Sequence, residues 1–136
     1  MNKTIVLATD HAGFELKEHV KTFLIAKGYD VKDFGAFEYD GLDDYPDFIL
    51  PAAKYISKYK LIGIIFGGSG QGEAIAANRI KGIRAAVYYN GPTEIIELSR
   101  LHNNANILSI GARFINDQEV EKAVSYTHLT LPTRLP

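Results

Sequence analysis

Five short apolar segments alternate along the chain with amphipathic helical segments, and the loops between them are short. This alternation predicts a Rossmann-like, three-layer α/β domain with a five-stranded parallel sheet. The length of 136 residues and the hydrophobic share of 46% suit one compact domain with its own core. We expect that domain to occupy residues 1–124, with residues 125–136 outside it.

The N-terminal segment sets the pattern. The apolar run at 5–8 is too short for a signal peptide or a membrane span, and it predicts a buried parallel strand. In the helix that follows, Leu16, Val20, Phe23 and Leu24 form one apolar stripe, and the charged residues, Lys17 among them, fall off it. Gly28 is a typical helix stop. The other expected elements are strands at 31–34, 61–66, 84–88 and 106–110 and helices at 47–58, 73–80, 92–101 and 117–124.

Composition excludes several classes of function. With 15 Lys and Arg against 16 Asp and Glu, the chain lacks the basic surplus of a duplex nucleic-acid binder. It has no cysteine, so disulfides, thiolate catalysis and Cys-ligated zinc are excluded. Lack of disulfides favours a cytoplasmic location, and we expect neither a nucleic-acid nor a membrane partner.

A glycine-rich loop is the sharpest local feature. Gly67, Gly68, Gly70 and Gly72 follow a buried strand and precede a helix. Such a backbone can approach a ligand closely and present its N–H groups to an anion or an oxyanion. The dinucleotide and P-loop fingerprints both fail, because Glu73 stands where each needs another residue. A tight strand-to-helix turn, with Glu73 merely complementing the helix dipole, is the alternative.

Glu73 is the best candidate for a catalytic base. It stands in the first turn of the expected helix, beside donors that could hold an enediolate. A carboxylate next to an oxyanion-stabilising backbone is what proton abstraction beside a carbonyl requires. The pattern therefore predicts proton-transfer chemistry at this loop.

The other polar candidates each have a structural alternative. His102 could shuttle a proton to a sugar ring oxygen or could cap a helix C-terminus. Asp10, before His11 at the end of the first strand, could face a ligand or cap the next helix. Arg113, like Arg84, could bind phosphate or form a surface ion pair. No ligand spacing supports a metal site from Asp10, His11 and His102, so we expect no metal. His19 is expected to be solvated.

Together these segments resemble the ribose-5-phosphate isomerase B family, which includes the galactose-6-phosphate isomerase subunits. The match is collinear from residue 4 to about 124, and the order and spacing of its motifs make it specific. The matching stretches are 8–14 with 16–17, 44–47, 67–73, 75–79, 82–86, 99–106 and 111–113.

The resemblance implies a reaction and a set of roles. Family members isomerise aldose and ketose phosphates through a cis-enediolate without a metal or organic cofactor. They are dimers or tetramers whose sites lie at the dimer interface. One branch uses a cysteine at the position of Gly67 and the other a glutamate at the position of Glu73, so this chain resembles the glutamate branch.

The same match implies roles for other residues. His102 opens the sugar ring, and Asp10 lies nearby. Ser69 and the loop N–H groups hold the enediolate, and His11 and Arg113 face the phosphate. The substrate-binding set implied is Asp10, His11, Tyr45, Gly67, Gly68, Gly70, Gln71, Gly72, Asn103 and Arg113.

The C-terminal residues depart from the family pattern. Residues 125–136 carry two prolines and a threonine at every third position from Thr127, and we expect them neither to continue the helix nor to form a strand. Family members continue with a helix whose His and Arg residues bind the phosphate group of the substrate. We therefore interpret residues 125–136 as a non-native tail, and we expect a higher Michaelis constant than in a chain with a family-like C-terminus.

The sequence thus predicts an aldose–ketose isomerase of carbohydrate metabolism. Ribose 5-phosphate, a pentose phosphate pathway substrate, is the expected sugar, and a homodimer or homotetramer the expected assembly. Two alternatives stay open: a non-catalytic sugar-phosphate or nucleotide binding module, and a partner-dependent galactose-6-phosphate isomerase subunit.

Overall fold

The computed structural model describes residues 4–38, 41 and 46–127. Its strands are β1 (Thr4–Thr9), β2 (Asp30–Asp33), β3 (Ile62–Gly67), β4 (Ala85–Tyr88) and β5 (Ile107–Gly111). Its helices are α1 (Phe14–Ala26), α2 (Pro46–Tyr59), α3 (Gln71–Ala77), α4 (Glu94–Asn103) and α5 (Asp117–Thr127), with short 3₁₀ turns η1 (His11–Gly13) and η2 (Ala112–Phe114).

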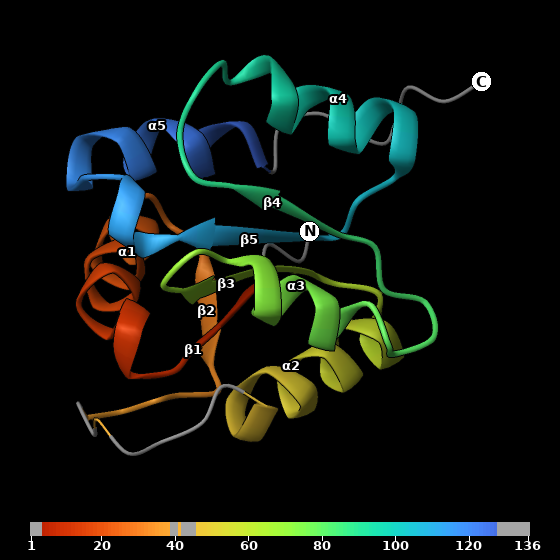
Figure 1. Cartoon of the computed structure of the whole chain (residues 1–136). Coiled ribbons are helices and arrows are strands. Elements are labelled where there is room, and N and C mark those ends of the chain that lie inside the picture. The colour runs from red at the N-terminus through yellow and green to blue at the C-terminus, as the bar shows by residue number, and fades with distance from the viewer. Residues whose placement is uncertain (1–3, 39–40, 42–45, 128–136) are drawn as a thin grey trace.

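The five strands form one parallel sheet in the order β2-β1-β3-β5-β4. Helices α1, α4 and α5 cover one face and α2 and α3 the other, which gives three layers (Figure 1). The central strands β1, β3 and β5 are buried almost throughout, because helices cover both of their faces. The predicted fold class is confirmed.

Two hydrophobic clusters hold the layers together. On one face, apolar residues of α1, α4 and α5 pack on the sheet, among them Val20, Ile96 and Val120. On the other face, Ile49 and Ile56 of α2 pack on the sheet beside the small residues of α3. The apolar stripe predicted for α1 is therefore a real core face, with Leu16, Val20 and Leu24 buried.

The structure corrects three local expectations. Lys17 was expected off the buried stripe, yet it is completely buried, because Asp33 at the end of β2 pairs with it. His19 does not merely meet solvent: its Nε2 lies 2.7 Å from a carboxylate oxygen of Glu121 on α5. Helix α3 begins two residues earlier and ends three residues earlier than predicted, at Ala77.

The last helix ends later than predicted. Helix α5 continues to Thr127, so residues 125–127 do extend the helix, contrary to expectation. Residues 128–136 lie outside the described part of the chain, and the interpretation of the tail stays a prediction. No helix in the described residues is long and apolar enough to cross a lipid bilayer.

Candidate active site

The segments that follow β1 and β3 meet at one edge of the sheet. Thr9 at the end of β1 pairs with Phe66 on β3, so Asp10 leaves the sheet beside Gly67, the last residue of β3. The chain then turns to α1 on one face and to α3 on the other. A crevice at such a switch point, outside the carboxyl ends of the strands, is where open α/β sheets bind ligands. We call this side of the molecule the carboxyl edge.

Glu73 lies at the centre of this edge. It is the third residue of α3, and only 5% of its surface is exposed. Its carboxylate lies directly over Gly67: a Cβ built on Gly67 would fall 1.9 Å from the carboxylate carbon and 2.0 and 2.2 Å from the two oxygens. A side chain at residue 67 and this carboxylate position therefore exclude each other.

The surroundings of Glu73 favour its protonated form. Burial raises the pKa of the carboxyl group, and the negative charge of Asp10 raises it further. Hydrogen bonds from the backbone N–H groups of Glu73 and Gly70 and the positive charge of Arg113 act against this rise without cancelling it. A carboxylate with a raised pKa is a stronger base than an ordinary one once it is ionised.

We expect this balance to respond to its two neighbours. The change Asp10→Asn should lower the pKa of Glu73, because it removes a like charge while asparagine can still cap the turn that follows. The change Arg113→Met should raise it, because it removes an opposite charge. Carbon-13 NMR titration of the Glu73 carboxyl group measures both shifts. Glu15→Gln is the control, since Glu15 lines the same edge but is not among the groups with the largest effects on the pKa of Glu73. A rise in Asp10→Asn would contradict this electrostatic account.

The glycine loop is held to β5 at its turning point. Gly70 has φ of 80°, in the left-handed region that favours glycine, and it is the N-cap of α3. The buried hydroxyl of Ser109 donates a 2.7 Å hydrogen bond to its carbonyl oxygen. Ser69 accepts a 3.2 Å hydrogen bond from the N–H of Gln71, which leaves the hydroxyl proton of Ser69 for another acceptor. The sequence reasoning missed Ser109, although a polar residue inside the apolar strand 107–110 was a usable signal.

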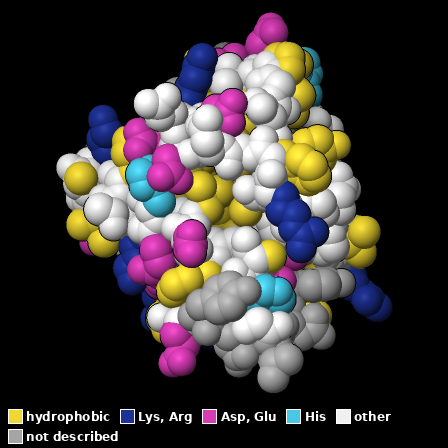
Figure 2. Space-filling model, turned by 60° about the vertical axis from the view of Figure 1, so that its left-hand side comes forward, with side chains coloured by type: hydrophobic (Ala, Val, Ile, Leu, Met, Phe, Trp, Pro, Cys, Tyr) yellow, Lys and Arg dark blue, Asp and Glu magenta, His cyan; other side chains and the backbone are white. Residues whose placement is uncertain are grey.

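His11 and Arg113 come together beside the glycine loop. They line an open polar depression of about 330 Å³ with Ala12 and Glu15. The guanidinium of Arg113 lies against Gly68, where an added Cβ would come within 3.1 Å of its Cζ and Nε atoms. The backbone N–H of Arg113 also donates to the Gly68 carbonyl oxygen at 3.0 Å. Figure 2 brings this side of the molecule toward the viewer and shows most of its acidic side chains gathered on the left.

Asp10 caps the turn that follows β1, and it also lies at the carboxyl edge. One carboxylate oxygen accepts a 2.9 Å hydrogen bond from the N–H of Ala12, so Asp10 caps the turn η1 rather than α1 itself. The residue is 7% exposed, and its charge reaches Glu73. An N-cap and a place at the carboxyl edge are therefore compatible here.

His102 and Asn103 lie at the opposite end of the sheet. They are in the last turn of α4, and both are exposed. Helix α4 starts after β4 at the carboxyl edge and ends just before β5 begins, about 15 Å farther along the sheet for its ten residues. Figure 1 shows the end of α4 on the far side from the start of α1. His102 and Glu73 of one chain therefore do not meet.

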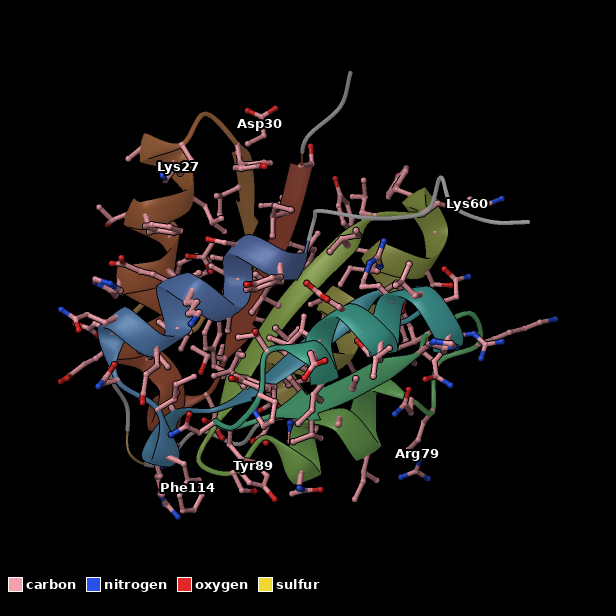
Figure 3. All side chains as sticks on the ribbon, turned by 90° about the horizontal axis from the view of Figure 1, so that it is seen from above. Lys27, Asp30, Lys60, Arg79, Tyr89 and Phe114 are labelled. Carbon is pink, nitrogen blue, oxygen red and sulfur yellow. The ribbon has the colours of Figure 1, made fainter. Side chains whose placement is uncertain are left out.

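The remaining predicted residues differ in their placement. Gln71 lines a separate small depression with Val87, Tyr88, Tyr89, Asn90 and Ile95, rather than the one beside His11 and Arg113. Tyr89 and Phe114 lie together at the carboxyl edge of the sheet, and Lys60, Asp30 and Lys27 lie at its opposite end (Figure 3). Arg84 precedes β4 and so lies away from Arg113.

Tyr45 is outside the described residues. Within the described residues, no group of three or more His, Asp or Glu side chains could hold a metal ion.

Comparison with known proteins decides the family. The family described as Ribose/Galactose Isomerase matches residues 5–130. The chain belongs to this family. It is therefore an enzyme, an aldose–ketose isomerase, and the alternative of a non-catalytic binding module is set aside. The family resemblance read from the sequence motifs is confirmed.

Relatives of this isomerase agree in sequence and in structure. Ribose-5-phosphate isomerase B of Mycolicibacterium paratuberculosis is 44% identical over 110 residues, which cover 80% of this chain and 68% of the relative. The crystal structure of ribose-5-phosphate isomerase B from Mycoplasma genitalium with bound ribulose-5-phosphate is 36% identical, with a TM-score of 0.86, and the match covers 91% of this chain and 82% of that one. The enzyme from Thermotoga maritima has a TM-score of 0.89 and 39% identity, over 96% and 88% of the two chains.

Proposed function

We propose that this isomerase interconverts ribose 5-phosphate and ribulose 5-phosphate, with Glu73 as the base. The observation that carries the proposal is the Glu73 carboxylate itself: it is buried, its pKa is raised, and it lies over Gly67 beside a loop of backbone N–H donors. Several relatives are ribose-5-phosphate isomerases B, and one of their structures holds ribulose-5-phosphate.

In the proposed reaction, the open-chain aldose lies with C1 and C2 against Glu73. The carboxylate takes the proton from C2, and the electrons of the broken C–H bond form the C1–C2 double bond of a cis-enediolate while the carbonyl oxygen gains negative charge. Backbone N–H groups of the loop and the Ser69 hydroxyl stabilise that charge. The proton of the O2 hydroxyl then moves to O1, Glu73 returns its proton to C1, and the C2 carbonyl forms, which gives the ketose.

The depression beside His11 and Arg113 suits the phosphate end of this substrate. Arg113 can present its planar guanidinium to phosphate oxygens in a bidentate contact. Its position against Gly68 keeps that contact next to the glycine loop. Glu15 on the rim is exposed and solvated, so its charge opposes the phosphate only weakly.

Ring opening requires a second chain in this proposal. His102 and Asn103 lie at the wrong end of their own sheet for Glu73, so we propose that a partner subunit supplies both. The outer face of α4 supports such an assembly: Ile95, Leu98 and Leu101, three residues apart, are 44%, 48% and 45% exposed. Residues at this spacing form one stripe on a helix, and an exposed apolar stripe next to polar residues is typical of an interface.

A mixing experiment tests the shared site. Glu73→Gln and His102→Asn should each be nearly inactive alone. Mixed under conditions that exchange subunits, equal amounts should recover about a quarter of the wild-type rate, because half of the dimers are mixed and each has one intact site. Steady-state assays before and after exchange measure the recovery. If exchanged dimers form and the rate stays at the level of the single variants, the site is not shared.

The substrate itself is tested on the purified chain alone. A panel of aldose 5-phosphates and 6-phosphates is assayed for ketose formation. We expect the highest kcat/KM with ribose 5-phosphate. Higher activity with galactose 6-phosphate, or activity that requires a second gene product, would instead favour the partner-dependent subunit.

A further inference from the structure

Lys17 and Asp33 form a buried ion pair that the proposed reaction does not use. The Lys17 side chain has no exposed surface and that of Asp33 is 6% exposed, and their Nζ and Oδ2 atoms are 2.6 Å apart. Lys17 also contacts Glu18 at 2.8 Å, and its ammonium lies over the rings of Phe14 and Phe37. Replacing a buried ion pair with apolar residues is often neutral or stabilising, so stability alone does not account for this one.

The Lys17–Asp33 pair holds the turn at residues 33–36 against the end of β1. While Oδ2 of Asp33 binds Lys17, Oδ1 accepts a 2.8 Å hydrogen bond from the N–H of Gly35. The Gly35 carbonyl accepts from the N–H of Thr9 at 2.7 Å, and the N–H of Ala36 donates to the Thr9 carbonyl at 2.9 Å. Both backbone groups of Thr9 are therefore held by the turn that Asp33 organises.

Thr9 connects this turn to the site. Its hydroxyl lies 3.1 Å from the Phe66 carbonyl oxygen, one residue before Gly67, and 2.9 Å from the carbonyl oxygen of Asp10. Asp10 follows Thr9 directly and is the negative charge that faces Glu73. A continuous set of contacts thus joins the buried pair to the position of Asp10.

We propose that Lys17 and Asp33 are positioning residues, which hold Thr9 and Asp10 in register with Glu73. The inference deepens the proposed function, but its main readout does not require activity. The charged groups concerned are few: Asp10 and Arg113 face Glu73, and Glu18 and Lys21 face the pair, Lys21 at 3.1 Å from Asp33.

The test replaces both charges at once. Lys17→Met with Asp33→Asn leaves the net charge unchanged, avoids an unpaired buried charge, and keeps an oxygen that can accept from Gly35. Carbon-13 NMR titration should show a lower pKa for the Glu73 carboxyl, in the same direction as in Asp10→Asn, because Asp10 is no longer held against it. Adding Asp10→Asn to the double variant should give less than the sum of the two shifts.

Activity supplies the second readout. If the proposed function holds, kcat should fall roughly 10- to 100-fold, since a misplacement of about 1 Å at a reacting group can cost about 100-fold. KM should change much less. Lys21→Met is the control, because it removes the partly exposed contact to Asp33 and leaves the buried one. An unchanged Glu73 pKa in the folded double variant would overturn the inference, even if the wild-type chain proved inactive on every sugar phosphate tested.

Discussion

Replacing Glu73 with glutamine lowers kcat/KM by about 10²–10⁴-fold, the usual contribution of a general base. Glutamine keeps the shape of the side chain but cannot accept the proton from C2. The kinetic loss should come without a loss of stability. Steady-state kinetics with ribose 5-phosphate and urea unfolding near neutral pH measure the two effects.

The stability part follows from the direction of the pKa shift. The pKa of Glu73 in the folded state is raised above its ordinary value by burial, so folding favours the protonated form. The contribution of Glu73 to the free energy of unfolding is therefore fully present below the ordinary pKa of glutamic acid. It is lost as the pH rises through the folded-state pKa. Glutamine does not titrate, so the variant should be at least as stable as the wild type at pH 7.

Glu94→Gln is the matched control for this variant. Glu94 is also in the first turn of a helix, but it is exposed on α4. Its replacement should leave kcat/KM near the wild-type value and, if anything, lower stability slightly through the helix dipole. A Glu73→Gln enzyme with wild-type turnover would eliminate the role of Glu73 as base.

Replacing Gly67 with alanine should cost about 100-fold or more in kcat without unfolding the protein. The added Cβ would fall 1.9–2.2 Å from the Glu73 carboxylate. The carboxylate is the far end of a flexible side chain, so it can move away while the backbone stays. A base displaced by an ångström or more loses most of its rate advantage. Kinetics and thermal unfolding of the variant measure the two consequences.

A double-mutant cycle separates displacement of the base from damage to the loop. In a Glu73→Ala background, Gly67→Ala should have little further effect, because the group it displaces is already gone. If Gly67→Ala instead lowers kcat by the same factor in the wild-type and Glu73→Ala backgrounds, Gly67 acts through the structure of the loop. The same overlap would account for the two branches that the family resemblance implies, one with a glutamate at position 73 and the other with a cysteine at position 67. A side chain at position 67 enters the space that the Glu73 carboxylate occupies here.

The fold could be predicted from hydrophobic periodicity because the patterns of strands and helices differ clearly in this chain. The continuous apolar runs, such as 61–66, became strands covered on both faces, and the stripe with Val20 became the buried side of α1. The position of Glu73 beside the glycine loop also followed from local order along the chain.

Three features could not be read in this way. Lys17 is buried because a carboxylate on another strand faces it, and helical periodicity carries no such information. The separation of His102 from Glu73 depends on the direction in which α4 runs. Ser109 matters through a single long-range hydrogen bond to Gly70. Each depends on tertiary structure that the local sequence pattern does not encode.

The central claim is that Glu73 moves a proton at C2 of a sugar phosphate, and isotope exchange tests it most directly. The enzyme is incubated with ribose 5-phosphate in deuterium oxide, and the recovered aldose is examined by proton NMR. We predict that the wild type introduces deuterium at C2 while Glu73→Gln, at equal concentration, introduces almost none. Equal deuterium incorporation by the two proteins would contradict the account.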